Sequence, residues 1–321
     1  MRIMLTGASG FIGSALVPRL QEQGHEVWQA RRYHAGGFNF YDDPKIVLFD
    51  LRDSRETRDA VFKVKPDMII HLGAVSAVSY SFLHPEEVND VIYQGTIRLA
   101  EAAKEIGAHL VHASSSEVYG RGNYTYPITE DQPIGGTSPY AAGKVAAEEY
   151  LRIMANTYKT PITIMRPFNT IGRALINNRH YVVERAICQA LETGLIKLHD
   201  PRPVRDFVWR EDHVAGYLAV VANPEAAIGQ TFNVCTGGGW SIKEMAEAVA
   251  ARVRYISRWD VSVDFSQVPD RPLDILRLQG SNEKIRAVLG FHIENSIDQA
   301  ITKATDEWYQ VLLGTVKRPQ V

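Results

Sequence analysis

The stretch ASSSEVYGRGNYTYPITEDQPIGGTSPYAAGK, residues 113–144, decides how the rest of the chain is interpreted. It starts inside an apolar run ending at 111–114, which predicts a buried strand with polar side chains at its tip. Tyr140 and Lys144 follow at the spacing i, i+4. That spacing places a phenol and an ammonium on one face of a helix.

This pair of residues suggests acid–base chemistry. A neighbouring ammonium stabilises a phenolate, so we expect Lys144 to lower the pKa of Tyr140 and let it exchange protons near neutral pH. Ser115, at the strand tip, is placed to bind the substrate oxygen on which the tyrosine acts. A Tyr-x-x-x-Lys pair alone is common on helix surfaces. Here it follows SSSEVYG and TSP directly, and the combination indicates a catalytic site.

These residues resemble the extended short-chain dehydrogenase/reductase family, which includes nucleotide-sugar epimerases, dehydratases and decarboxylases. The segment around Glu117 is most similar to nucleotide-sugar 4,6-dehydratases such as GDP-mannose 4,6-dehydratase. The resemblance covers nearly the whole chain. It implies an α/β fold, with a Rossmann doubly wound parallel sheet and a smaller C-terminal α/β lobe that binds the substrate.

A glycine-rich turn lies near the N-terminus. Residues 2–6 form a short apolar strand, Gly7, Gly10 and Gly13 follow, and a helical pattern continues to Leu20. Glycines at this spacing allow a tight turn and close approach of the backbone to a pyrophosphate. The start of the helix presents N–H groups to the phosphates. The order strand, glycine turn, helix predicts a dinucleotide site.

The second predicted strand, residues 26–29, ends where the ribose of the cofactor would lie. Ala30, Arg31 and Arg32 follow it, in place of the acidic residue that binds the 2′-hydroxyl of NAD. Guanidinium groups suit a 2′-phosphate, so we predict NADP, with NAD as the alternative. Two solvated arginines in a loop are the structural alternative.

The resemblance implies further contacts with the cofactor and the substrate. Cofactor contacts are implied for Ser9, Phe11, Ile12, Asp50, Leu51, Leu72, Gly73, Ala74, Ser76, Tyr140, Lys144 and Pro167. Substrate contacts are implied for Ser76, Ser116, Asn169, Arg185, Arg205 and Arg271.

The rest of the chain alternates strands with helices. Strands are predicted at 46–49, 68–72, 162–166 and 231–234, and helices at 140–158 and 181–193. This order predicts a parallel sheet with ligands at the carboxyl ends of the strands. We assign 1–169 to an NADP-binding Rossmann domain, with 206–235 returning to it, and 170–321 mainly to the substrate lobe. We also expect His71 to be a core histidine and Ser241 to cap a helix.

Composition excludes several classes of protein. The chain has 321 residues, and its 45% hydrophobic content is ample for a core and for two lobes. A net charge of −2 argues against a nucleic-acid partner. The two cysteines supply neither a disulfide framework nor a multi-cysteine metal site. The chain starts without a signal-like segment and has no apolar run of roughly 18 residues. We therefore expect a cytoplasmic protein, a homodimer, with no metal and no membrane contact.

Glu117 is the residue that separates the reactions of the family. The resemblance implies that 4-epimerases usually have a small residue or threonine there, whereas 4,6-dehydratases and UDP-glucuronate decarboxylases have glutamate. Oxidation at C4 of a hexose acidifies the C5 proton, and one carboxyl can take that proton and give it to the hydroxide leaving C6. We therefore predict a 4,6-dehydratase, with a loop-capping Glu117 as the structural alternative.

Other functions stay open at this stage. The same fold serves 4-epimerases, 4-keto-sugar reductases and decarboxylases, for which Arg173 or Arg185 is a candidate partner of the substrate carboxylate. A non-catalytic NADP-sensing regulator is the alternative from another class. The predicted substrate is a nucleotide-diphosphate sugar. GDP is our first choice because of the resemblance around Glu117 and Arg31, and UDP is close behind. Residues 199–202 replace a glycine-rich turn of many relatives, so we expect the pocket for the base to differ from theirs.

Overall fold

The structure, a computed structural model, describes residues 1–32, 45–122, 124–172, 179, 181–265 and 275–312. Its centre is a seven-stranded sheet with the strand order β11-β6-β5-β4-β1-β2-β3. All neighbouring strands in it are parallel. The strands are β1 (Arg2–Thr6), β2 (Glu26–Arg31), β3 (Ile46–Leu48), β4 (Met68–His71), β5 (His109–Ala113), β6 (Ile162–Pro167) and β11 (Thr231–Val234).

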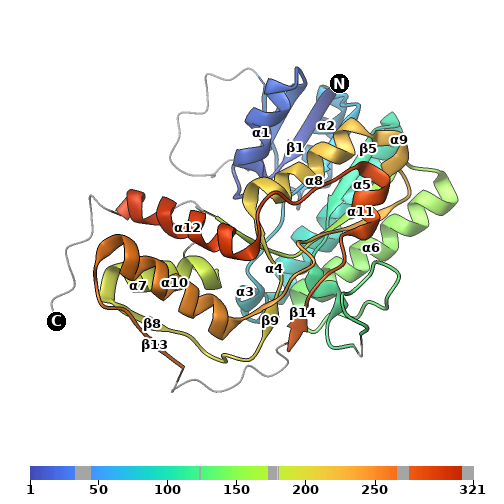
Figure 1. The fold of residues 1–321 in the computed structure, drawn as a ribbon. Coiled ribbons are helices and arrows are strands. Elements are labelled where there is room, and N and C mark those ends of the chain that lie inside the picture. Colours follow the sequence, from blue (N-terminus) through green and yellow to red (C-terminus); the bar gives the residue numbers. More distant parts are fainter. Residues whose placement is uncertain (33–44, 123, 173–178, 180, 266–274, 313–321) are drawn as a thin grey trace.

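Helices cover both faces of this sheet (Figure 1), which confirms the predicted Rossmann fold. One face carries α1 (Gly13–Glu22), α8 (Arg210–Ala222), α9 (Pro224–Ala227) and α11 (Glu283–Leu289). The other carries α2 (Ser54–Val64), α5 (Gly95–Ile106) and α6 (Pro139–Tyr158).

The apolar runs in the strands explain this arrangement. Successive residues of a strand point to opposite faces, so a strand buried on both sides is apolar throughout. Ile3 and Leu5 of β1 pack into the core beneath α1 and α8. Met4, between them, packs into the core beneath α2, α5 and α6. Strand β1 therefore contributes to two hydrophobic cores, one on each face of the sheet.

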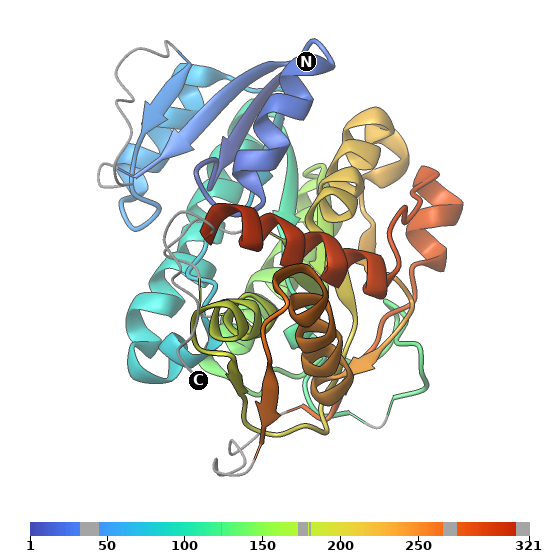
Figure 2. The same ribbon diagram turned by 60° about the vertical axis from the view of Figure 1, so that its left-hand side comes forward.

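A separate core lies between α7 (Val182–Thr193), α10 (Ile242–Ser257) and α12 (Ile297–Leu312), with Trp308 fully buried in it. Figures 1 and 2 show these three helices packed together at one end of the molecule. The parallel strands β8 (Leu195–Lys197) and β13 (Ser262–Asp264) lie beside them. This part corresponds to the expected substrate lobe, whereas β11 returns to pair with β6 of the central sheet.

Smaller elements join the two parts. Two short sheets have the orders β10-β7 and β12-β9-β14, formed by β7 (Asn169–Ile171), β9 (Val204–Arg205), β10 (Phe207–Trp209), β12 (Trp240–Ser241) and β14 (Arg277–Leu278). The short helices are α3 (Val78–Leu83), α4 (Pro85–Asn89), the π-helix η2 (Asp90–Gln94) and the 3₁₀-helix η3 (Ser116–Tyr119). The exact domain division stays a prediction.

Two predicted boundaries that matter for the site were wrong. The second strand does not end at residue 29 but continues through Arg31, because β3 offers it a partner and Arg31 pairs with Leu48. The helix predicted from Tyr181 begins at Val182, and Tyr181 precedes it in an extended conformation. Ser241 caps α10 through a reciprocal capping box with Glu244, as predicted.

A buried ion pair joins the strands and helices that surround the strand tips. Glu148 of α6 and Arg166 of β6 are 0% and 1% exposed, and Arg166 donates from Nε and Nη2 to the carboxylate over 2.9 and 2.7 Å. Ser114 donates to the same carboxylate over 2.5 Å. Arg166 Nη1 also donates to the hydroxyl of Tyr119 over 2.9 Å. The charges of the Glu148 carboxylate and the Arg166 guanidinium therefore balance each other, and Ser114 and Tyr119 supply further hydrogen bonds.

Replacing Arg166 tests this network. R166M should lower the free energy of unfolding by about 3–5 kcal/mol, because the Glu148 carboxylate is left buried without its main partner. R152M is the matched control, since Arg152 also contacts Glu148 but is 34% exposed; it should cost about 1 kcal/mol or less. Urea unfolding of the three proteins measures the difference. Equal losses of unfolding free energy in both variants would show that the buried contact of Glu148 with Arg166 contributes no more to stability than its contact with Arg152.

Candidate active site

A cleft of about 650 Å³ opens at the carboxyl ends of the central strands and extends to α7 and β9. Every site residue predicted from the sequence and described by the structure lines it. Arg271 lies outside the described residues. The lining includes Gly7, Ser9, Gly10, Phe11, Ile12, Gly13, Arg31, Arg32, Asp50, Leu51, Leu72, Gly73, Ala74, Ser76, Ser115, Ser116, Glu117, Tyr140, Lys144, Pro167, Asn169, Arg185 and Arg205.

The glycine turn after β1 is shaped for close approach of backbone atoms. Gly7 has φ +70°, and a Cβ there would lie 2.9 Å from the amide nitrogen of Gly73. A Cβ on Gly13 would lie 2.2 Å from the carbonyl oxygen of Gly7. The first turn of α1 has no side-chain cap among the described residues. The residues present thus fit the diphosphate of a dinucleotide, which would bind against the N–H groups of α1.

The opposite end of this part of the cleft carries charged side chains. Arg31 and Arg32 line it where β2 ends, and the Arg31 guanidinium donates to the Gln29 amide oxygen. Asp50 also lines it, and its hydrogen bond with Arg52 lowers the pKa of the Asp50 carboxyl. Guanidinium groups at this edge provide positive charge for the ribose end of the cofactor.

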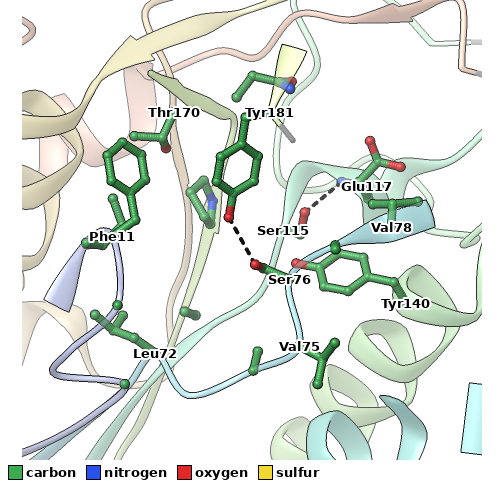
Figure 3. A pocket seen from close by; sticks show the side chains of 18 of the residues that line it. Phe11, Leu72, Val75, Ser76, Val78, Ser115, Glu117, Tyr140, Thr170 and Tyr181 are labelled. Carbon is green, nitrogen blue, oxygen red and sulfur yellow. Dashed lines mark hydrogen bonds between the residues drawn. The ribbon is translucent and has the colours of Figure 1, made fainter. Parts of the chain in front are cut away.

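Ser115 after the tip of β5 and Tyr140 in the first turn of α6 line the same part of the cleft (Figure 3). Lys144, one turn further along α6, lines it as well. Ser115 is close enough to the Tyr140 hydroxyl to oppose the rise of its pKa. Lys144 Nζ donates to the Ala113 carbonyl oxygen over 2.5 Å. Ser114, the neighbour of Ser115, is turned away into the buried network, where it donates to Glu148. Of these two serines, Ser115 is therefore the one that lies beside Tyr140.

The expectation that Lys144 lowers the pKa of Tyr140 was wrong for this structure. Burial raises the pKa of Tyr140 to about 12, and the hydrogen bond from Ser115 opposes that rise only in part. Burial also lowers the pKa of Lys144 to about 8, against the opposing influence of Glu148. Desolvation dominates because both groups are almost fully enclosed, and it disfavours the charged form of each.

Glu117 lies in the same part of the cleft, in η3 directly after the tip of β5. Its backbone N–H donates to Ser115 Oγ over 3.2 Å, which fixes the start of the turn. Its carboxylate is close enough to Tyr140 to raise the pKa of the phenol. The site therefore contains a carboxyl group besides the serine, tyrosine and lysine.

Tyr181 and Glu184 are among the lining residues that sequence reasoning did not assign to the site. Tyr181 donates to or accepts from Ser76 over 3.0 Å across the cleft, as the dashed line in Figure 3 shows. Glu184 is fully buried on α7, and one of its oxygens accepts from the Gly172 N–H over 3.1 Å. A signal for Glu184 existed, since it precedes Ile187, Cys188 and Leu191 of the apolar face by three, four and seven residues.

The candidate substrate residues differ in their surroundings. Arg205 Nη1 donates to the carbonyl oxygens of Val204 and Ile275 over 3.0 and 2.7 Å. Its neighbour Asp206 accepts from Thr236 and Gly237, so it holds the loop after β11 and is not directed at a ligand. Of these two neighbours, Arg205 is therefore the candidate ligand residue, and Asp206 is structural.

His71 is a core residue, as predicted. Its Nδ1 lies 2.7 Å from Thr6 Oγ1 and its Nε2 lies 3.2 Å from Thr96 Oγ1. Burial lowers the pKa of His71 to about 3, so the ring is neutral. The described residues contain no group of three or more histidine, cysteine and acidic side chains arranged for a metal. None of the helices in the described ranges is long and apolar enough to cross a membrane.

Comparison with known proteins identifies the family to which the chain belongs. A model of the NAD dependent epimerase/dehydratase family matches residues 3–235. The chain is 34% identical to a UDP-glucose 4-epimerase from Mycolicibacterium smegmatis, over 95% of this chain and 98% of that protein.

Two solved structures extend the comparison. Pal from Bacillus thuringiensis superposes with a TM-score of 0.88 at 26% identity, over 97% of this chain and 100% of that one. The UDP-glucose 4-epimerase of Thermus thermophilus in complex with NAD superposes with a TM-score of 0.83 at 27% identity, over 96% and 99%.

The chain belongs to the NAD dependent epimerase/dehydratase family. The predicted resemblance to extended short-chain dehydrogenases/reductases is thereby confirmed. The protein is an enzyme of this family that modifies nucleotide sugars with a nicotinamide dinucleotide.

Glu184 makes the stability of the protein depend on pH. Burial raises the pKa of Glu184 from 4.5 to about 7 in the folded protein. The folded state therefore holds this proton more tightly than the unfolded state, and stability falls as pH rises from about 4.5 to 7. E184Q keeps the acceptor for Gly172 but cannot ionise. Relative to that of wild type, the free energy of unfolding of E184Q should increase by on the order of 2–3 kcal/mol between pH 5 and pH 8.

Urea unfolding at the two pH values measures this gain. E192Q is the matched control, because Glu192 is on the same helix but 39% exposed and paired with Arg179. A difference between E184Q and wild type that stays constant from pH 5 to pH 8 would show that the Glu184 carboxyl does not titrate in this range.

Proposed function

We propose that the protein is a nucleotide-sugar 4,6-dehydratase, which converts a nucleotide-diphosphate hexose into its 4-keto-6-deoxy form. The observation that carries the proposal is the position of Glu117. It lines the cleft with Ser115 and Tyr140 and acts electrostatically on the tyrosine. A dehydratase needs a second acid–base group beside the tyrosine, whereas a 4-epimerase does not.

The side chains divide the proposed reaction between them. Burial raises the pKa of Tyr140 to about 12, so the phenol must be ionised before it acts as a base, and the positive nicotinamide ring of an oxidised dinucleotide would favour that phenolate. The phenolate of Tyr140 takes the proton of the C4 hydroxyl, whose oxygen Ser115 holds. A bound dinucleotide would supply the redox chemistry, taking hydride from C4 and later giving it to C6. Glu117 takes the C5 proton and gives it to the hydroxide that leaves C6 as water. Tyr140 returns its proton to C5 as hydride reaches C6, so that the carboxylate and the phenolate are both regenerated. Lys144 Nζ donates to the Ala113 carbonyl oxygen and lines the same cleft.

A 4-epimerase is the second candidate. The relative from Mycolicibacterium smegmatis, at 34% identity, favours it. In that case Glu117 would support the loop only. A decarboxylase needs a cation at the substrate carboxylate, and Arg185 lines the cleft. The Ser76–Tyr181 hydroxyl pair on the wall of the cleft carries no charge that could pair with a substrate carboxylate, which disfavours the decarboxylase. A 4-keto-sugar reductase would keep Tyr140 without using Glu117.

The nucleotide of the substrate is the finer part of the proposal. We propose UDP first, because the Mycolicibacterium and Thermus relatives are UDP-glucose 4-epimerases. GDP is the second candidate and is supported by the sequence around Glu117 and by Arg31. His199 and Asp200 line the cleft near Arg205, where the nucleotide would bind. A cytoplasmic homodimer, expected from the sequence, belongs to the same proposal.

A substrate panel tests the proposed reaction. Purified protein should convert one of UDP-glucose, UDP-N-acetylglucosamine, GDP-mannose and dTDP-glucose into a product lighter by one water. Mass spectrometry and NMR identify the 4-keto-6-deoxy sugar. A C4 epimer as the only product would replace the dehydratase by the epimerase. Carbon dioxide released from UDP-glucuronate would indicate the decarboxylase.

The role of Glu117 is tested by a variant in the same assay. E117Q should slow dehydration by about 10²- to 10⁴-fold while C4 oxidation persists, so that reduced cofactor accumulates. E149Q, on α6 with a 67% exposed side chain, is the control and should retain activity. A dehydration rate in E117Q equal to that of wild type would remove Glu117 from the mechanism.

The cofactor is proposed to be NADP, because Arg31 and Arg32 line the cleft where β2 ends. Protein purified without added nucleotide and then denatured should release NADP, identified by mass spectrometry. R32E should shift the preference of the refilled protein toward NAD, since a carboxylate repels the 2′-phosphate and accepts from a 2′-hydroxyl. Release of NAD alone from the wild type would contradict the proposal.

A further inference from the structure

Two pairs of hydroxyl groups face the reacting part of the cleft. The first is Ser115 and Tyr140, described above. The second is Ser76 and Tyr181, which are separated by 105 residues in the chain and whose hydroxyl oxygens lie 3.0 Å apart. Ser76 is in the loop between β4 and α3, on the Rossmann side, whereas Tyr181 precedes α7. The second pair therefore bridges the two parts of the protein.

Tyr181 is directed at the same space as Tyr140. Its phenol is close enough to Tyr140 to raise the pKa of that residue, as Glu117 also does. Figure 3 shows the Tyr181 hydroxyl pointing to Ser76, with Tyr140, Ser115 and Glu117 around the same opening. The ring of Tyr181 is tilted against Phe11 of the glycine turn, with centroids 6.2 Å apart. The ring is thus anchored while the hydroxyl reaches the site.

The chemistry of this second pair suits a neutral sugar. A serine or tyrosine hydroxyl both donates and accepts, as does each hydroxyl of a hexose. The bond between Ser76 and Tyr181 can therefore be exchanged for bonds to the sugar without leaving a polar group unsatisfied. Neither hydroxyl is a cation, so a carboxylate on the substrate would lose its water at this wall without gaining an ion partner.

We propose that Ser76 and Tyr181 hold the hexose opposite the Ser115–Tyr140 pair, and that Tyr181 positions the sugar and selects neutral hexoses over hexuronates. This inference rests on the proposed function, because it assumes a nucleotide hexose in the cleft. In this arrangement Tyr181 is a positioning residue: it orients C4 toward Tyr140 and takes no proton itself. The nucleotide part of the ligand is bound elsewhere in the cleft and does not depend on the pair.

Comparing a nucleotide sugar with its nucleotide tests the proposal. Calorimetry on the cofactor-loaded protein uses UDP-glucose with UDP, GDP-mannose with GDP and dTDP-glucose with dTDP; the pair that wild type binds most tightly is then used for the variants. Y181F, which keeps the ring on Phe11, should bind the sugar nucleotide about three- to tenfold more weakly and the nucleotide diphosphate unchanged. S76A should likewise weaken binding of the sugar nucleotide and leave binding of the nucleotide diphosphate unchanged.

Selectivity and a matched control complete the design. Wild type should bind UDP-glucuronate more weakly than UDP-glucose. Y255F is the control, because Tyr255 lies on α10, is 63% exposed and is not in the cleft; it should leave both affinities unchanged. Equal losses for sugar nucleotide and nucleotide in Y181F, no loss at all, or tighter binding of UDP-glucuronate would each overturn the proposal. Wild type that binds none of the pairs would refute the proposed function and this inference with it.

Discussion

The buried ion pair between Glu148 and Arg166 is the interaction on which the site depends. Glu148 lies four residues after Lys144 and eight after Tyr140, so all three occupy one face of α6. Arg166 is in β6, directly before Pro167, and Ser114 at the tip of β5 donates to the same carboxylate. The pair therefore sets α6 against the ends of two strands. It therefore helps to hold Tyr140 of α6 close to Ser115 at the tip of β5.

The position of this network also explains why it is built from charged groups. The strand tips of a parallel sheet are where ligands bind, so the side chains there must stay polar while their neighbours are buried. A carboxylate and a guanidinium that satisfy each other, together with Ser114 and Tyr119, let the interior stay closed behind the site. Ser115 is then free to face the cleft, because Ser114 is the serine bound to Glu148.

Burial governs the chemistry of the site as much as the identity of its residues does. Tyr140 and Lys144 are each shifted toward their neutral forms by desolvation. The wall made by α7 adds the buried carboxyl Glu184 and the phenol of Tyr181. Hydroxyl and carboxyl groups thus surround the place where the sugar is proposed to react. Such a lining favours a substrate that is neutral at its reacting end.

The sequence alone determined the family, the Rossmann sheet and many of the residues that meet in the cleft. Local patterns suffice for these, since apolar strands, the glycine turn and the i, i+4 spacing of Tyr140 and Lys144 are properties of short segments. Only the tertiary structure decided that Tyr181 meets Ser76 across 105 residues, that Glu184 is enclosed, and that Lys144 bonds the Ala113 carbonyl oxygen. Contacts between distant segments and the loss of water around a charge both depend on how the elements pack, and no short stretch of sequence contains that information.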